Sequence, residues 1–270
     1  MSGLLTRIWI EVRWPVLWFC LGLASIMALL TRLLPKVLGN IHEMFSKMPM
    51  VKPLLTAMLG VDPGDKVSTE LSQAFLWVHP TVLTLLWAHA VMYCTRVPAG
   101  EVDRGTADFL LCLPVTRAQI YLAETFGGIA SGLLILMTGF VGHRLGSIQS
   151  PHDMVLSAGD SLRVLLNLGC VSTAVGSLAC LISACSDRRG KAIGVVFAVL
   201  VASFLLNFLA QFQDWAKSIS WLSVMEYYRP AIIIQTHELP WKDLAVLAGI
   251  SVVCWTGGLL VFKERSICTV

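Results

Sequence analysis

Six long apolar runs separated by polar segments dominate the chain. They cover approximately residues 15–34, 75–93, 125–146, 164–184, 192–212 and 244–262. Each run is close to the ~20 residues that an α-helix needs to cross the hydrocarbon core of a bilayer. The pattern therefore predicts an all-α integral membrane protein, with one domain over residues 1–270 and six transmembrane helices.

The N-terminal segment before the first run has a mixed character. Residues 3–13 combine apolar side chains with Arg7, Glu11 and Arg13. This composition is typical of an amphipathic helix that lies along the membrane surface. We therefore expect an N-terminal interfacial helix at residues 3–13.

The most charged segment between two apolar runs is residues 100–124. Its apolar side chains recur at helical spacing: Val102, Thr106, Phe109, Leu110 and Leu113. Glu101, Arg104 and Asp108 fall on another face, where Glu101–Arg104 and Arg104–Asp108 pairs are possible. The spacing predicts a short amphipathic helix whose apolar face packs on the protein.

A second helix is expected directly after this one. Pro114 ends the first helix because proline disfavours a helical conformation at the residue before it. Thr116 and Gln119 have the spacing of a capping box, and Val115 and Ile120 that of a hydrophobic staple. The sequence therefore predicts a turn followed by a helix that enters the membrane.

The pattern E-x-x-R-G-T-x-x-x-L-L-x-x-P-V-T-R at residues 101–117 resembles the cytoplasmic signature of ABC-2 type transporter permeases. The matching positions are Glu101, Arg104, Gly105, Thr106, Leu110, Leu111, Pro114, Val115, Thr116 and Arg117. In that family the short helix is a coupling helix that docks on a separate ATPase. The resemblance implies a coupling site made by Glu101, Arg104, Gly105, Thr106, Asp108, Leu111, Pro114 and Arg117.

The resemblance also implies a working complex. Two permeases, identical or related, would associate with two ABC ATPase subunits in a bacterial inner membrane, and the partner would use ATP and Mg. Residues 221–230 resemble the external re-entrant segment of the family. The ending at residues 262–267 resembles the family's basic C-terminus, but Glu264 and Ser266 depart from it, so no function is assigned to it.

Composition agrees with a membrane protein. Apolar residues make up 56% and charged residues 14% of the chain, against about 25% charged residues in soluble domains. The net charge of +3 gives no reason to expect a nucleic-acid partner. Positive charge is denser in the short segments on the side of the termini, as in Arg188, Arg189 and Lys191. The positive-inside rule therefore predicts that both termini are cytoplasmic.

Three stripes of small residues allow close packing in the membrane. They are Gly128 and Gly132; Gly169, Thr173 and Ser177; and Gly194, Ala198 and Ala202. The sequence leaves open whether each stripe packs within one chain or between two.

Catalytic and metal motifs are scarce. Gly190-Lys191 is followed by alanine and lacks the upstream glycine of a phosphate-binding loop, so the chain is not expected to be an ATPase, to bind a cofactor or to hold a metal. His89 is the candidate for lining a transport pathway, since polar groups at membrane depth are often functional. His79-Pro80 is expected to loosen the second crossing.

The sequence leaves three alternative functions open. The methionines of the first external loop (Met44, Met48, Met50 and Met58) could offer thioethers to Cu(I). A membrane scaffold or assembly factor that does not transport is the alternative to a permease. An intramembrane enzyme that uses His79 or His89 is a third possibility.

Overall fold

The computed structural model describes residues 2–39, 56, 59, 69–148 and 155–266. Within these ranges the chain forms helices and turns and contains no strand. Six segments are long and apolar enough to cross a membrane: α1 (Ser2–Gly39), the pair α4 (Thr69–Val78) and α5 (Pro80–Cys94), α8 (Arg117–Ser147), α9 (Ala158–Ala184), α10 (Arg189–Ala210) and α13 (Trp241–Glu264). The predicted all-α fold with six crossings is confirmed.

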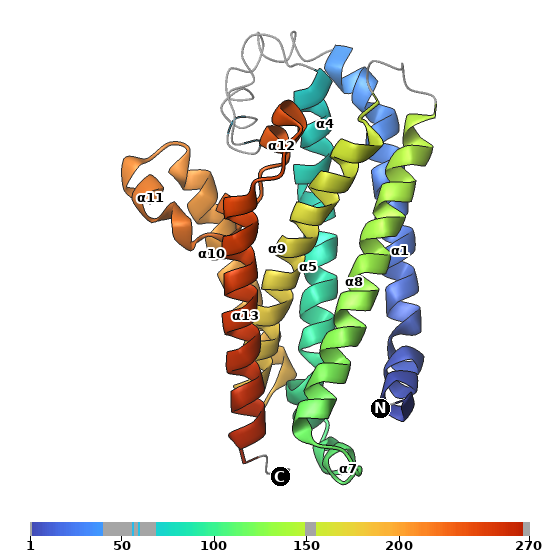
Figure 1. The fold of residues 1–270 in the computed structure, drawn as a ribbon, viewed down its shortest axis with the longest axis vertical. Coiled ribbons are helices and arrows are strands. Elements are labelled where there is room, and N and C mark those ends of the chain that lie inside the picture. The colour runs from blue at the N-terminus through green and yellow to red at the C-terminus, as the bar shows by residue number, and fades with distance from the viewer. Residues whose placement is uncertain (1, 40–55, 57–58, 60–68, 149–154, 267–270) are drawn as a thin grey trace.

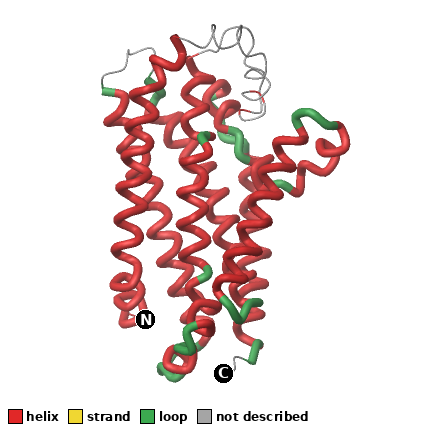
Figure 2. The backbone as a smooth tube through the Cα atoms, turned by 180° about the vertical axis from the view of Figure 1, so that it is seen from behind, coloured by secondary structure: helices red, strands yellow, loops and turns green. Residues whose placement is uncertain are grey.

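The six segments stand roughly side by side in one bundle (Figure 1). Helix α9 is central, because it contacts α5, α8, α10 and α13. Both chain ends and the short α7 (Ala107–Leu111) lie at the same end of the bundle, which Figure 2 shows from behind. We call this the basal end. The even number of crossings thus brings the two termini and residues 101–117 together, as the sequence predicted.

The first crossing differs from its prediction. Residues 3–13 are joined directly to the first crossing as the first turns of α1, which is assigned as one helix from Ser2 to Gly39. Leu4, Ile8 and Val12 are buried in the core of the bundle. Their spacing of four residues places them on one helical face. One apolar face of this segment therefore packs on the protein, while Leu5, Trp9 and Ile10 are exposed on the other side.

Helices α1 and α8 pack closely because α8 carries glycines along the contact. A Cβ atom added to Gly142 would lie 2.2 Å from the carbonyl oxygen of Ala24, and one added to Gly146 would lie 2.5 Å from that of Ala28. No side chain larger than hydrogen fits at either position. In lipid, such close backbone contact replaces the hydrophobic effect as a source of helix association.

The second crossing is broken near its upper end, as His79-Pro80 predicted. His79 lies between α4 and α5 and caps α5, where its Nδ1 accepts a hydrogen bond from the Thr81 amide at 3.4 Å. The imidazole thus supplies an acceptor where Pro80 interrupts the helical hydrogen bonds.

The segment between α10 and α13 folds into α11 (Asp214–Ile219), η3 (Ser220–Leu222), η4 (Val224–Tyr227) and α12 (Pro230–Thr236). Buried Asn167 of α9 holds this segment: its amide donates to the Tyr227 carbonyl at 3.1 Å, and its oxygen accepts from the Arg229 amide at 3.2 Å. The expected re-entrant segment at residues 221–230 therefore packs against the bundle at the end opposite the termini. Met44, Met48, Met50 and Met58 lie outside the described residues.

Candidate functional site

The basal segment at residues 101–117 is built around a helix stop. Helix α6 (Glu101–Asp103) ends in a Schellman motif, in which the Thr106 amide donates to the Glu101 carbonyl at 2.9 Å and the Gly105 amide to that of Val102 at 3.0 Å. Gly105 has a φ of 68°, which glycine adopts without strain. The expected single helix over residues 101–113 is therefore wrong, because this turn separates α6 from α7.

Glu101 is the anchor of this segment. Its side chain is only 2% exposed and accepts hydrogen bonds from Arg7 at 2.9 Å, Arg104 at 2.6 Å and Thr106 at 2.7 Å. Burial alone raises the pKa of this carboxyl, but the Thr106 hydroxyl and the two guanidinium groups outweigh burial and hold the pKa below its ordinary value. The predicted Glu101–Arg104 pair is confirmed, whereas Glu101 lies inside the protein and not on an exposed polar face.

The exposed side chains of α7 also differ from expectation. Phe109 and Leu113 were expected to pack on the bundle, but Phe109 is 79% exposed and Leu113 40% exposed. The buried residues of α7 are Ala107, at 3% exposure, and Leu110, at 4% exposure. The turn at Gly105 rotates α7 relative to α6, so the face assigned from one continuous helix does not apply. Arg104 and Asp108 are exposed as predicted.

The start of α8 has the predicted capping box. The Thr116 hydroxyl accepts from the Gln119 amide at 3.2 Å, and the Gln119 side chain accepts from the Thr116 amide at 2.8 Å. Arg117 then donates to the carbonyls of Phe262 and Arg265, at 3.2 and 2.5 Å. Arg117 therefore binds the carbonyl end of α13, where a cation is favoured by the helix dipole.

A basal charge cluster joins four elements at this end. It consists of Arg7 and Glu11 of α1, Arg96 of η1 (Arg96–Gly100), Glu101 of α6 and Glu124 of α8. Arg96 bridges Glu11 and Glu124. Burial opposes the charge of Arg96, yet the neighbouring Glu124 and Glu11 hold its pKa above the ordinary value. The cluster links residues 101–106 to both α1 and α8.

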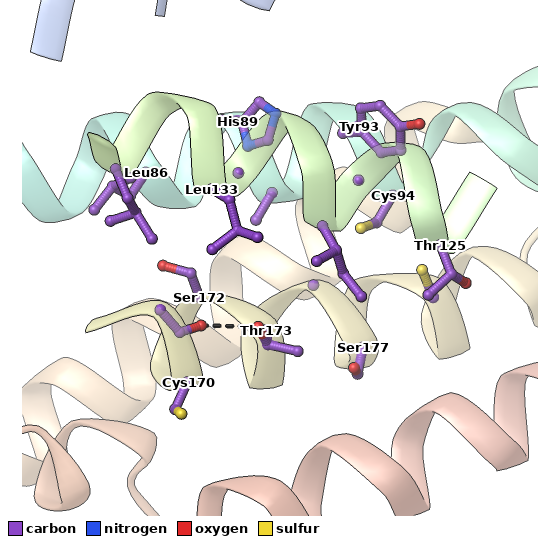
Figure 3. A pocket seen from close by; sticks show the side chains of 18 of the residues that line it. Leu86, His89, Tyr93, Cys94, Thr125, Leu133, Cys170, Ser172, Thr173 and Ser177 are labelled. Carbon is purple, nitrogen blue, oxygen red and sulfur yellow. Dashed lines mark hydrogen bonds between the residues drawn. The ribbon is translucent and has the colours of Figure 1, made fainter. Parts of the chain in front are cut away.

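A cavity of about 510 Å³ lies above this cluster, between α5, α8 and α9. Two of the predicted small-residue stripes form opposite walls: Gly128 and Gly132 on α8, and Gly169, Thr173 and Ser177 on α9. Figure 3 shows His89 and Tyr93 of α5 behind α8, with Ser172, Thr173 and Ser177 on α9 across the space. The small side chains leave the cavity open where larger ones would fill it.

His89 lines this cavity, as a pathway residue would, and is buried. Its Nε2 lies 3.1 Å from the Ser131 hydroxyl, and its ring packs edge-on against Phe19. The structure thus places His89 at the cavity wall with one hydrogen bond, while its role in transport stays a prediction.

Sequence reasoning missed two features of this region. Arg265 belongs to the ending that received no function, yet it donates to the Ala184 carbonyl at 2.7 Å and pairs with Asp187. Glu124 was passed over because it precedes an apolar run, and only its contact with Arg96 reveals its position in the cluster. Neither contact is local, so helical spacing gave no signal for them.

Comparisons with known proteins identify a family. No curated protein matches the chain. A protein-family comparison matched residues 2–263 to the family described as "Multidrug efflux system permease Rv1217c, C-terminal domain". This match extends from the first turn of α1 to the last turn of α13. The chain therefore belongs to this family and is a multi-pass membrane protein of the transporter-permease kind.

Proposed function

We propose that this chain is the permease subunit of an ATP-driven ABC-2 type exporter that works with a separate ATPase. The observation that carries the proposal is the shape of the basal segment. Phe109 is an exposed apolar side chain on α7, Arg104 is exposed at the end of α6, and buried Glu101 fixes the turn between these helices to the bundle. A firmly held segment with an exposed aromatic and charged tip suits docking on a soluble partner.

The coupling site expected from the sequence then divides into two kinds of residue, and Phe109, which was not expected in it, joins the exposed kind. Arg104, Asp108 and Phe109 are exposed and make the contact with the ATPase. Glu101, Thr106 and Arg117 bond within the chain and hold the contact surface in place. ATP binding closes the ATPase pair and moves α7, and the charge cluster passes this motion to α1 and α8.

The orientation of the chain in the membrane follows from docking of the basal segment on the ATPase. Residues 101–117 and both termini share the basal end, so all three are cytoplasmic. The denser positive charge of the basal segments supports this orientation, because cytoplasmic loops are rich in Lys and Arg. The membrane is then the bacterial inner membrane, and transport proceeds outward.

A second permease completes the complex in this proposal. Gly194, Ala198 and Ala202, the third small-residue stripe, are exposed on α10, whereas the other two stripes line the cavity. Small residues on a lipid-facing helix permit close association with another helix. The exposed stripe supports α10 as a surface that the second permease covers.

The test is a pull-down of the ATPase encoded beside this chain. We expect Phe109→Ala to reach the membrane at wild-type level but to lose at least tenfold in ATPase association and in substrate-dependent ATP hydrolysis. Phe126→Ala is the matched control, since Phe126 is also exposed but lies within the α8 crossing and outside α7. Leu110→Ala should instead lower expression, because Leu110 is buried.

Unchanged association in Phe109→Ala would contradict docking through α7. An ATPase that binds the wild type, with no nucleotide-dependent transport of any tested compound, would favour the scaffold over the permease.

A further inference from the structure

The cavity between α5, α8 and α9 has an unusual distribution of polarity. Its walls are mostly apolar, and Glu124 is the only Asp, Glu, Lys or Arg among the described residues that line it. Glu124 lies at the basal end, near Thr125 and the indole of Trp255, whose Nε1 donates to the Thr125 hydroxyl at 2.9 Å. The opposite end is lined by Met137, Leu162 and Leu166. The cavity is therefore polar at one end and apolar at the other.

The cavity is also elongated. Its lining extends along α8 from Tyr121 to Met137, which is about 24 Å at the helical rise of ~1.5 Å per residue. Its volume of about 510 Å³ lies within the range of ~300–1,000 Å³ that is typical of small-molecule sites. A long, narrow occupant fits this space better than a compact one.

The opening faces sideways. Exposed apolar side chains form its rim: Ile129, Leu133 and Met137 of α8, and Leu162 and Leu166 of α9. These residues lie within membrane-spanning segments, so the rim meets hydrocarbon and not either aqueous phase. Deeper residues such as Leu86 and His89 are buried. An occupant therefore enters from the lipid.

The hydroxyl groups that line the cavity are of two kinds. The hydroxyls of Ser172 and Tyr93 are buried and have no partner among the described residues, so they are available to a polar atom of an occupant. Thr173 donates its hydroxyl to the Gly169 carbonyl of its own helix at 2.8 Å, and Tyr121 donates its hydroxyl to the Trp255 carbonyl at 3.2 Å. Polar groups that are already bonded accept an apolar neighbour at little cost.

We propose that this cavity binds the alkyl chain of an uncharged or zwitterionic amphiphile, with the polar end of the molecule near Glu124 and the chain toward Leu166. The alkyl chain has two possible sources, a membrane phospholipid and a transported single-chain amphiphile, and they share the same contacts. Binding of an alkyl chain does not require an ATPase, so it can be tested independently of the proposed transport function.

Photo-crosslinking of the full-length chain in phospholipid nanodiscs tests the proposal. One arm contains phosphatidylethanolamine with a diazirine near the end of one acyl chain. The other adds a diazirine-bearing alkyl maltoside to unlabelled nanodiscs. Peptide mass spectrometry should find adducts at residues 129–137 of α8 and 162–173 of α9 at least fivefold above those on the exposed face of α13, which carries Val252, Val253 and Leu260. Labelling in the first arm identifies a lipid source, and labelling in the second alone identifies a transported amphiphile.

Thr173→Trp should reduce these adducts at least fivefold by filling the cavity. Thr256→Trp is the matched control, since Thr256 is likewise exposed, donates its hydroxyl to its own helix and lies outside the cavity. If Thr173→Trp fails to fold, Gly169→Leu replaces it, because a Cβ at Gly169 meets only Leu136 at an ordinary 3.5 Å.

Adducts spread evenly over all exposed helices, or adducts that Thr173→Trp and Gly169→Leu leave unchanged, would overturn the proposal. A chain–chain crosslink across the opening without probe adducts inside would also overturn it, since a second copy would then cover the rim.

Discussion

Replacing Glu101 by glutamine tests whether the buried carboxylate holds the basal segment. The change keeps the shape of the side chain but removes the charge that Arg7 and Arg104 contact at 2.9 and 2.6 Å. Removing one partner of a fully buried ion pair costs about 3–5 kcal/mol, whereas an exposed pair contributes about 0–1 kcal/mol.

The ion pairs of Glu101 should contribute a free energy between these two limits. The carboxylate is buried, but the side chains of Arg7 and Arg104 are 35% and 53% exposed. Water therefore compensates part of the loss on the arginine side. A glutamine can still accept one hydrogen bond from Thr106 or an arginine. We expect Glu101→Gln to lower the free energy of unfolding by about 1.5–3 kcal/mol, the range for hydrogen bonds to charged groups.

The assay is unfolding of the purified chain in mixed micelles, by titration with SDS. Asp103→Asn is the control, since Asp103 lies on the same short helix but is exposed, and its substitution should change stability by less than about 0.5 kcal/mol. If Glu101→Gln and Asp103→Asn have equal effects, Glu101 is not an anchor. A double-mutant cycle with Arg7→Gln should show non-additive effects, because the two residues are in contact.

The pH dependence gives a second measurement on the same pair of proteins. The pKa of Glu101 is lower in the folded chain than its ordinary value, so its contribution is complete at neutral pH and is lost as the pH falls below about 4. The difference in stability between wild type and Glu101→Gln should therefore shrink in acid. A difference that is constant from pH 7 to pH 3 would exclude a charge effect.

Three further predictions concern docking, packing and orientation. Arg104→Glu should fold and reach the membrane but lose ATPase association in a pull-down, because the substitution replaces a positive charge at the docking surface by a negative one. Association at the wild-type level would refute a contact at Arg104. Gly142→Leu should strongly lower the melting temperature in detergent, because it separates α1 from α8. Gly194→Leu should leave the melting temperature unchanged, since Gly194 is exposed and has no neighbouring atom within 4 Å. Equal melting temperatures of the two variants would contradict the close contact between α1 and α8. Reporter fusions should show Arg104 and Arg189 in the cytoplasm and Gln235 outside. Activity of an external reporter fused at Arg104 would contradict the proposed orientation of the chain in the membrane.

Features that depend on neighbouring residues were predictable from the sequence. The run at 192–212 corresponds to α10 at Arg189–Ala210, and the run at 244–262 to α13 at Trp241–Glu264. The requirement for ~20 apolar residues is a property of each segment alone. The capping box of Thr116 and Gln119 was equally accessible, since both residues lie within one turn.

Features that depend on distant contacts were not predictable. Helical spacing placed Glu101 on an exposed face, but its burial requires Arg7, which is 94 residues away in the chain. The small-residue stripes indicated close packing, and spacing alone could not show that two of them would face a cavity. Phe109 became exposed because Gly105 turned the chain, and a glycine within a helical pattern does not reveal its φ.

The glycine contacts between α1 and α8 have a mechanical consequence. Two helices joined at backbone distance cannot slide past each other without a clash, so they tilt as one body. Helix α8 has 31 residues and is therefore about 46 Å long, so a tilt of about 3° about one end displaces the other end by about 2 Å. One wall of the cavity lies along α8. A tilt of the joined pair relative to α9 would therefore change the width of the cavity opening between α8 and α9.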